Sequence, residues 1–108
     1  MRIISGNLKG KKILQPKDKN TRPLKDLTKE SIFNILEHSN LLNVKIEKSN
    51  ILDLFSGVGS FGLECLSRGS RSVTYIENYT NTLVLLFHYN SCCGLFLEST
   101  FRLIKLKM

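Results

Sequence analysis

The sequence lacks the residues from which several familiar kinds of site are built. Its 108 residues include three cysteines, an odd count with two adjacent, which suits neither a disulfide framework nor a zinc site. The first residues contain no long apolar stretch typical of a secretory signal, and polar side chains interrupt the uncharged run 78–97. We therefore expect reduced thiols, a cytoplasmic location, no membrane span and no metal.

Basic residues are concentrated near the start of the chain, although the net charge of +7 belongs to the whole sequence. Residues 1–30 hold nine basic and three acidic side chains, so this segment alone carries +6. A field of one sign attracts a polyanion, and nucleic acid is the usual one. The alternative is an ordinary solvated basic face.

The first forty residues predict a β-hairpin followed by a helix. Residues 2–5 and 11–14 are short extended runs separated by glycine and asparagine, which permit a chain reversal. A helix is expected over 27–38, because Leu27, Ile32, Ile35 and Leu36 recur on one side, with Phe33 flanking them. The helix should end near Ser39 and Asn40.

From residue 50 the pattern changes to that of a β-α-β unit. Residues 50–55 are almost continuously apolar, as in a strand buried on both faces. A helix over about 61–66 should end at Gly69, and residues 72–76 are β-branched and aromatic, as in a second strand. The expected fold class is therefore α/β, with these two strands parallel and adjacent.

The turn between the first strand and its helix reads GVGSFG, residues 57–62, which matches the glycine pattern of dinucleotide-binding loops. Gly57 and Gly59 let a ligand approach the backbone, Gly62 allows close packing of helix on strand, and Glu77 is suited to a ribose diol. A purely structural glycine turn remains an alternative.

Asp53, at the end of the first strand, discriminates between possible ligands. An acid here would repel the pyrophosphate of NAD, whereas S-adenosylmethionine carries a sulfonium and an ammonium group. The sequence therefore favours the methyl donor over a nicotinamide cofactor. The alternative for Asp53 is a cap for a helix or a turn.

Several blocks occur together in one order: RIISG (2–6), LKGKKI (8–13), TRP (21–23), KESIFNIL (29–36), DLFSGVGSFGLECLSRG (53–69) and VTYIE (73–77). Jointly they resemble the RsmD-type family of 16S ribosomal RNA guanine-N(2) methyltransferases. The resemblance implies a Rossmann-like fold, S-adenosylmethionine as methyl donor and ribosomal RNA, or a small-subunit assembly intermediate, as partner. It implies a donor site formed by Asp53, Phe55, Ser56, Gly57, Gly59 and Glu77, and RNA-phosphate contacts from Arg2, Lys9, Lys11, Lys12 and Arg22.

One part of the family pattern is missing. Such enzymes orient the target amino group with an Asp/Asn-Pro-Pro-aromatic motif after the fourth strand, but both prolines here, Pro16 and Pro23, precede the glycine loop. We therefore identify no catalytic residue and expect later strands to be absent, leaving an open edge beside the second strand.

These features predict the organisation of the chain. Residues 1–40 form a basic, RNA-contacting hairpin and helix, and 41–108 form a partial Rossmann-like domain with an aberrant tail from about residue 87. We expect a monomer, truncated or frame-shifted, with impaired catalysis. The alternatives are a small RNA-binding module with a structural glycine loop, or a fragment of a nicotinamide-dependent oxidoreductase.

Overall fold

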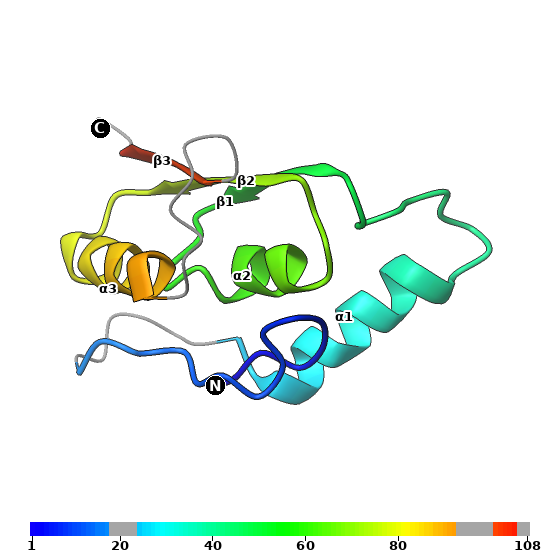
Figure 1. The fold of residues 1–108 in the computed structure, drawn as a ribbon, viewed down its shortest axis with the longest axis horizontal. Helices are drawn as coiled ribbons and strands as arrows, with labels where there is room; N and C mark the ends of the chain where they lie inside the picture. Colours follow the sequence, from blue (N-terminus) through cyan, green and yellow to red (C-terminus); the bar gives the residue numbers. More distant parts are fainter. Residues whose placement is uncertain (18–23, 93–100, 106–108) are drawn as a thin grey trace.

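The computed structural model describes residues 1–17, 24–92 and 101–105. Within these residues, three helices and three strands alternate after the N-terminal segment: α1 Asp26–His38, β1 Asn50–Leu54, α2 Ser60–Ser67, β2 Ser72–Glu77, α3 Thr80–Cys92 and β3 Phe101–Lys105. The strands form one parallel sheet in the order β1-β2-β3, with the helices on one side of it (Figure 1). The expected α/β class and parallel β-α-β unit are confirmed.

The sheet has one strand more than the sequence led us to expect. β3 runs parallel to β2, with Tyr75 opposite Leu103, so β2 is the central strand. The expectation of only two strands, with an open edge beside the second, is therefore wrong. α3 also continues past Phe87 to Cys92, into the tail that we expected to be aberrant. The open edges of the described sheet are the outer edges of β1 and β3.

The expectation that β1 is buried on both faces is also wrong. Its residues alternate between exposed and partly buried, and Leu52 and Leu54 are 58% and 56% exposed. The cause is the arrangement of layers, because α1, α2 and α3 all lie on the opposite side of the sheet (Figure 1). Side chains alternate between the two faces of a strand, so Ile51 and Asp53 face the helices instead.

The N-terminal hairpin is reduced to one antiparallel bridge between Arg2 and Lys12. The amide of Ile3 donates to the Lys11 carbonyl (2.9 Å), but the next residues leave the ladder. Their amides bind α2 instead, which explains why two full strands do not form. The helix expected over 27–38 is confirmed as α1, ending at His38.

The face of α1 that packs inward differs from the expected one. Lys29 and Phe33, one turn apart, are fully buried, whereas Leu27 and Ile35 are 75% and 59% exposed. Phe33 joins the main core, which also contains Ile46, Cys65, Leu66, Val73, Tyr75 and Leu86. A second cluster joins the N-terminal segment to α2 through Ile3, Ile13, Val58 and Leu63. Within the described residues, no helix is both long enough and apolar enough to cross a membrane.

Candidate functional site

The loop between β1 and α2 has an unusual backbone. Gly57 and Gly59 have φ values of 57° and 79°, and Phe55 has a φ of 55°. Positive φ is a genuine outlier for a bulky residue and costs free energy unless the surroundings impose it. Phe55 is also 79% exposed, so a strained aromatic side chain stands at the rim of the loop.

Glu77, the last residue of β2, is hydrogen-bonded to this loop. One carboxylate oxygen accepts the N–H of Gly57 (2.6 Å), and the other accepts the N–H groups of Asn78 and Tyr79 (2.8 and 3.0 Å). Glu77 thus joins the glycine loop to the start of α3. An ionised carboxylate offers about four lone-pair directions, so these three bonds leave little spare capacity.

Asp53 lies on the helix-facing side of β1, opposite Tyr75 in the sheet register. Its carboxylate accepts the N–H of Gly62 in the first turn of α2 (3.1 Å). The pKa of Asp53 is raised to about 6, chiefly by burial and to a smaller extent by the nearby Glu77 carboxylate, while the Gly62 hydrogen bond acts in the opposite direction. A cation beside Asp53 would favour the ionised form, because opposite charges attract most strongly away from water.

Gly59 and Gly62 must each be glycine because a side chain would clash, but with different parts of the protein. A Cβ at Gly62 would lie 2.4 Å from Tyr75 Cε1, which agrees with the expected close packing of helix on strand. A Cβ at Gly59 would lie 2.2 Å from Leu86 Cδ1. Gly59 is therefore required by the packing of α3, whether or not a ligand approaches it.

Ser56 lies in this loop, between Phe55 and Gly57. Its hydroxyl is buried and has no hydrogen-bond partner in the described part of the chain. Buried hydroxyl groups nearly always have partners, so the exception needs an explanation. Residues 1–17, 24–92 and 101–105 contain no group of three or more His, Cys, Asp or Glu side chains arranged to hold a metal ion.

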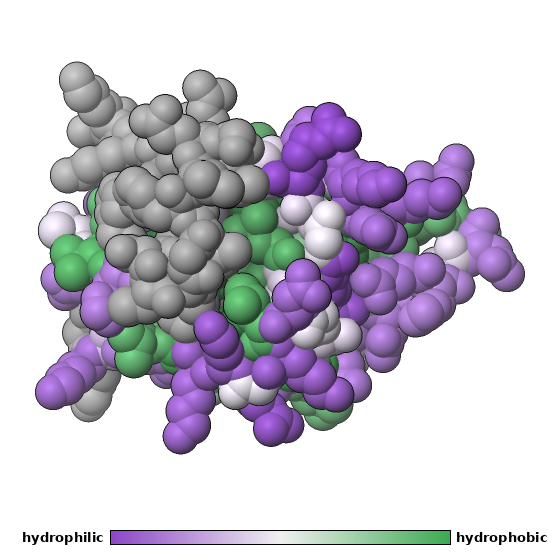
Figure 2. Space-filling view, viewed as in Figure 1, coloured by the Kyte–Doolittle hydropathy of each residue, from purple (hydrophilic) through white to green (hydrophobic). Residues whose placement is uncertain are grey.

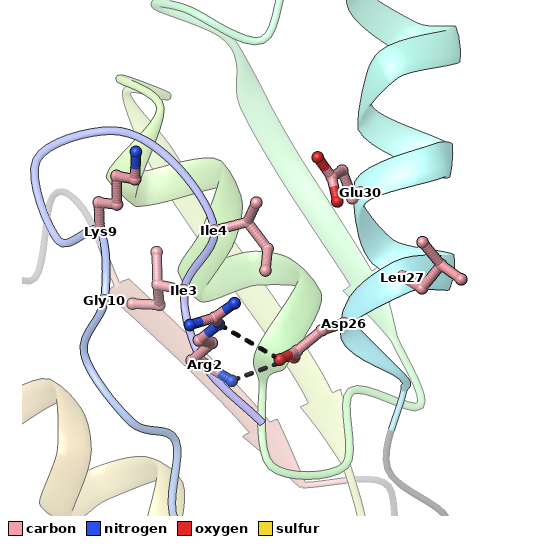
Figure 3. Close-up of a pocket in the computed structure, with 8 residues that line it drawn as sticks. All are labelled: Arg2, Ile3, Ile4, Lys9, Gly10, Asp26, Leu27 and Glu30. Atoms are coloured by element: carbon pink, nitrogen blue, oxygen red, sulfur yellow. Dashed lines mark hydrogen bonds and ion pairs between the residues drawn. The ribbon is translucent and has the colours of Figure 1, made fainter.

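The basic side chains lie apart from this loop, on the N-terminal segment. Arg2 forms an ion pair with Asp26 of α1 (3.6 Å), and its amide donates to the same carboxylate. Arg2 and Lys9 line a cavity of about 490 Å³ against Asp26, Leu27 and Glu30 (Figure 3). Arg2 is therefore partly neutralised.

The remaining basic residues lie at the surface or outside the described chain. Lys9, Lys11 and Lys12 are exposed, and Arg22 lies outside the described residues. Figure 2 shows hydrophilic residues gathered over the α1 end of the molecule, with apolar residues visible between them. A polyanion can reach the described lysines, of which Lys9 also lines the cavity beside Arg2.

A buried charged cluster between this segment and α2 was not expected from the sequence. Lys29 and Glu64 are both 0% exposed, with Lys29 Nζ 3.6 Å from Glu64 Oε2. Glu64 also accepts a hydrogen bond from Arg68 Nε (2.9 Å), one turn later in α2. The spacing of Glu64 and Arg68 is a detectable signal for that pair. Nothing in the local sequence links Lys29 to either.

Comparison with known proteins agrees with this geometry. The model of the family described as "Conserved hypothetical protein 95" matches residues 1–102. The chain is 42% identical over 77 residues to ribosomal RNA small subunit methyltransferase D of Buchnera aphidicola (subsp. Baizongia pistaciae), covering 71% of this chain and 37% of that protein. It is 38% identical over 77 residues to the protein of the same name from Escherichia coli K12, covering 71% and 36%.

Solved structures give the same result for the fold. "Putative methyltransferase yhhF from Escherichia coli" matches with a TM-score of 0.79 and 27% identity, over 99% of this chain and 52% of that chain. A hypothetical protein of Thermus thermophilus has the same fold, with a TM-score of 0.76 and 23% identity over 100% and 56% of the two chains. This chain thus spans little more than a third of these curated relatives and about half of these solved chains. It belongs to the family described as conserved hypothetical protein 95, and its resemblance to the RsmD-type methyltransferases is confirmed.

Proposed function

We propose that this chain is the donor-binding part of an S-adenosylmethionine-dependent methyltransferase that modifies the exocyclic amino group of a guanine in 16S ribosomal RNA. The observation that carries the proposal is the pair of carboxylates, Asp53 and Glu77, on either side of a loop with left-handed backbone at Phe55, Gly57 and Gly59. Relatives named as ribosomal RNA small subunit methyltransferases support the same reaction class.

The residues present suit S-adenosylmethionine, which supplies an activated methyl group when it is bound. Asp53 has a raised pKa and makes no ion pair within the described residues, so a sulfonium or ammonium group would favour its ionised form. The Ser56 hydroxyl has no partner in the described residues, so it keeps its hydrogen-bonding capacity for a ligand that reaches it. Glu77 would accept the ribose hydroxyl groups by giving up part of its present bonding to backbone N–H groups.

RNA would be held by the basic segment, working as a monomer in the cytoplasm on ribosomal RNA or an assembly intermediate of the small subunit. The residues that would contact phosphates are Arg2, Lys9, Lys11, Lys12 and Arg22, with Arg2 still largely exposed beside Asp26. Phosphate contacts position an RNA without reading its sequence, so the choice of guanine must come from other groups. The sequence lacks the Asp/Asn-Pro-Pro-aromatic motif, and we therefore expect this chain alone to have no measurable turnover.

Isothermal titration of the chain with S-adenosylmethionine tests the donor site. We expect binding that is lost in Asp53→Ala and in Glu77→Ala, and retained in Glu47→Ala, which removes an exposed carboxylate elsewhere. Circular dichroism of each variant verifies that it is folded. A folded wild-type chain without affinity for the donor would contradict the proposal.

A second candidate function is an RNA-binding module whose glycine loop is purely structural. The observation that favours it is that the carboxylates of Glu77 and Asp53 already have hydrogen-bond donors within the protein, the backbone N–H groups of Gly57 and Gly62. RNA binding without donor binding would support this candidate. Binding of NADH in place of the methyl donor would instead indicate a nicotinamide-dependent oxidoreductase fragment.

A further inference from the structure

The ammonium group of Lys29 lies between two parts of the molecule that the proposed function assigns to different ligands. Lys29 Nζ donates to the carbonyl oxygen of Arg2 (2.5 Å) and to the hydroxyl of Ser60 (3.2 Å). The whole side chain is buried, and burial lowers the pKa of Lys29 against the opposing effect of Glu64. A buried ammonium group is costly unless it is paired and hydrogen-bonded, so these contacts fix its position.

The same cluster holds the basic segment on α2. Glu64 accepts the N–H groups of Ile4 (2.9 Å) and Ser5 (3.0 Å), each through one carboxylate oxygen. Ser67 donates its hydroxyl to the Ser5 carbonyl (2.5 Å) and accepts the Leu8 amide (2.9 Å). The backbone of residues 4–8 is therefore positioned by side chains of α2.

Ser60 is the first residue of α2 and follows Gly59, the end of the glycine loop. One buried ammonium group thus contacts the backbone of the basic segment and the first residue after the loop. We propose that Lys29 is a positioning residue that couples these two parts, so that displacement of the basic segment by RNA changes the glycine loop through Ser60. The ligands of this coupling rest on the proposed function, whereas its contacts do not.

The first test needs no ligand and follows amide hydrogen exchange by NMR. The reporters are hydrogen-bonded amides at the two ends of the coupling, Ile4 and Ser5 in the segment and Gly57 and Gly59 in the loop. In Lys29→Met we expect exchange at both ends to quicken at least threefold relative to the β2 amides, which report global unfolding. Lys29→Arg, which keeps a cation, should restore protection at both ends.

Ser60→Ala is the milder variant, because it removes only the hydroxyl that Lys29 contacts. Its matched control is Ser31→Ala, which removes an exposed hydroxyl bonded to the Leu27 carbonyl within α1. We expect faster exchange at Gly57 and Gly59 in Ser60→Ala and no change in Ser31→Ala. Equal behaviour of the two variants, or a response at one end only in Lys29→Met, would overturn the coupling.

The second test uses a short single-stranded RNA as the probe. In the wild-type chain, RNA should shift the amide resonances of Gly57 and Gly59, and in Ser60→Ala these shifts should fall by at least half at unchanged RNA affinity. Full-size loop shifts in Ser60→Ala would count against the coupling. Failure of the wild-type chain to bind RNA would contradict the proposed function, and the ligand-free exchange would then decide the coupling by itself.

Discussion

Asp53 and Glu64 are two carboxylates on the helix-covered side of the sheet, and they differ in whether the described protein supplies them with a cationic partner. Glu64 has cations of its own, Lys29 and Arg68, and also accepts two backbone N–H groups. In the described part of the chain, Asp53 makes no ion pair and accepts the N–H of Gly62, which carries no net charge. Burial consequently raises the pKa of Asp53 to about 6.

The difference separates a charge that stabilises the fold from a charge suited to a ligand. A buried ion that already has its partners needs nothing further from solution. A partly buried carboxylate without a counter-ion destabilises the folded protein, and such positions are concentrated at functional sites. The comparison therefore assigns Glu64 to architecture and supports the proposed role of Asp53 in binding, and each prediction below tests one side of it.

The largest effect is expected where the completed cluster is broken. Glu64→Gln leaves Lys29 buried with its counter-charge removed, and breaking a buried pair in this way costs about 3–5 kcal/mol. The matched control is Glu37→Gln, because the Glu37 side chain is 32% exposed where it pairs with Arg68, and it should cost less than about 1 kcal/mol. Urea unfolding followed by circular dichroism measures both. Equal losses would mean that Glu64 is not the centre of the cluster.

A second pair of variants tests how tightly the basic segment is seated on α2. Gly6 and Gly10 both have a φ of +85°, so alanine meets the same backbone strain of about 1–2 kcal/mol at either position. They differ in space, because a Cβ at Gly6 would lie 1.9 Å from the Ser67 carbonyl oxygen, whereas nothing lies within 4 Å at Gly10.

Gly6→Ala should therefore lose roughly 1–3 kcal/mol more than Gly10→Ala, because crowding against a backbone carbonyl adds to the strain. Thermal and urea unfolding of the two variants measure the difference. Indistinguishable stabilities would show that residues 4–8 can leave α2 at little cost. The assignment of Glu64 to holding this segment on α2 would then be wrong.

What could be predicted from the sequence is local in origin. The glycine loop, the left-handed Gly69 after α2 and the parallel β1-α2-β2 unit depend on neighbouring residues, and all are confirmed. The positions of Asp53 and Glu77 at the ends of adjacent strands follow from the same unit. The hydrogen bond from Gly62 to Asp53 corresponds to the helix-cap alternative that the sequence left open.

What could not be predicted depends on contacts between distant segments. Lys29 gives no local sign of burial, since lysine is almost never fully buried unless paired, and its partner Glu64 lies on another helix. β3 was missed because its pairing with β2 is not encoded within the five residues FRLIK themselves. The hairpin was overestimated because Glu64 accepts the Ser5 amide and Ser67 donates to the Ser5 carbonyl, the two groups that would have continued the ladder beyond Ile3.

On the binding side of the comparison, Asp53→Asn should stabilise the folded chain while abolishing donor affinity. The pKa of Asp53 rises from 3.8 to about 6 on folding, so the folded chain favours the protonated carboxyl more than the unfolded chain does. The stability that this preference contributes is fully present below pH 3.8 and is lost as the pH rises through about 6. The asparagine keeps an acceptor for Gly62 without the buried charge. We therefore expect a gain of roughly 2 kcal/mol at pH 8 that disappears near pH 4.

Urea unfolding of Asp53→Asn and the wild-type chain across this pH range measures the effect. Glu47→Gln, at an exposed carboxylate, is the control and should change stability by less than about 0.5 kcal/mol at any pH. A loss of stability in Asp53→Asn at pH 8 would mean that the carboxylate has a cationic partner in the fold, and the distinction between Asp53 and Glu64 would then disappear.

The smallest effect is expected for the exposed lysines, because water and salt screen exposed charges. If Lys9 contacts an RNA phosphate, Lys9→Ala should lower the slope of log affinity against log salt by about 0.7 for single-stranded RNA. Lys45→Ala, at an exposed lysine outside the basic segment, should leave the slope unchanged. Fluorescence anisotropy with a labelled oligonucleotide at several salt concentrations measures both. Equal slopes for the two variants would mean that RNA is attracted by net charge alone, because a phosphate contact belongs to one position and general attraction does not.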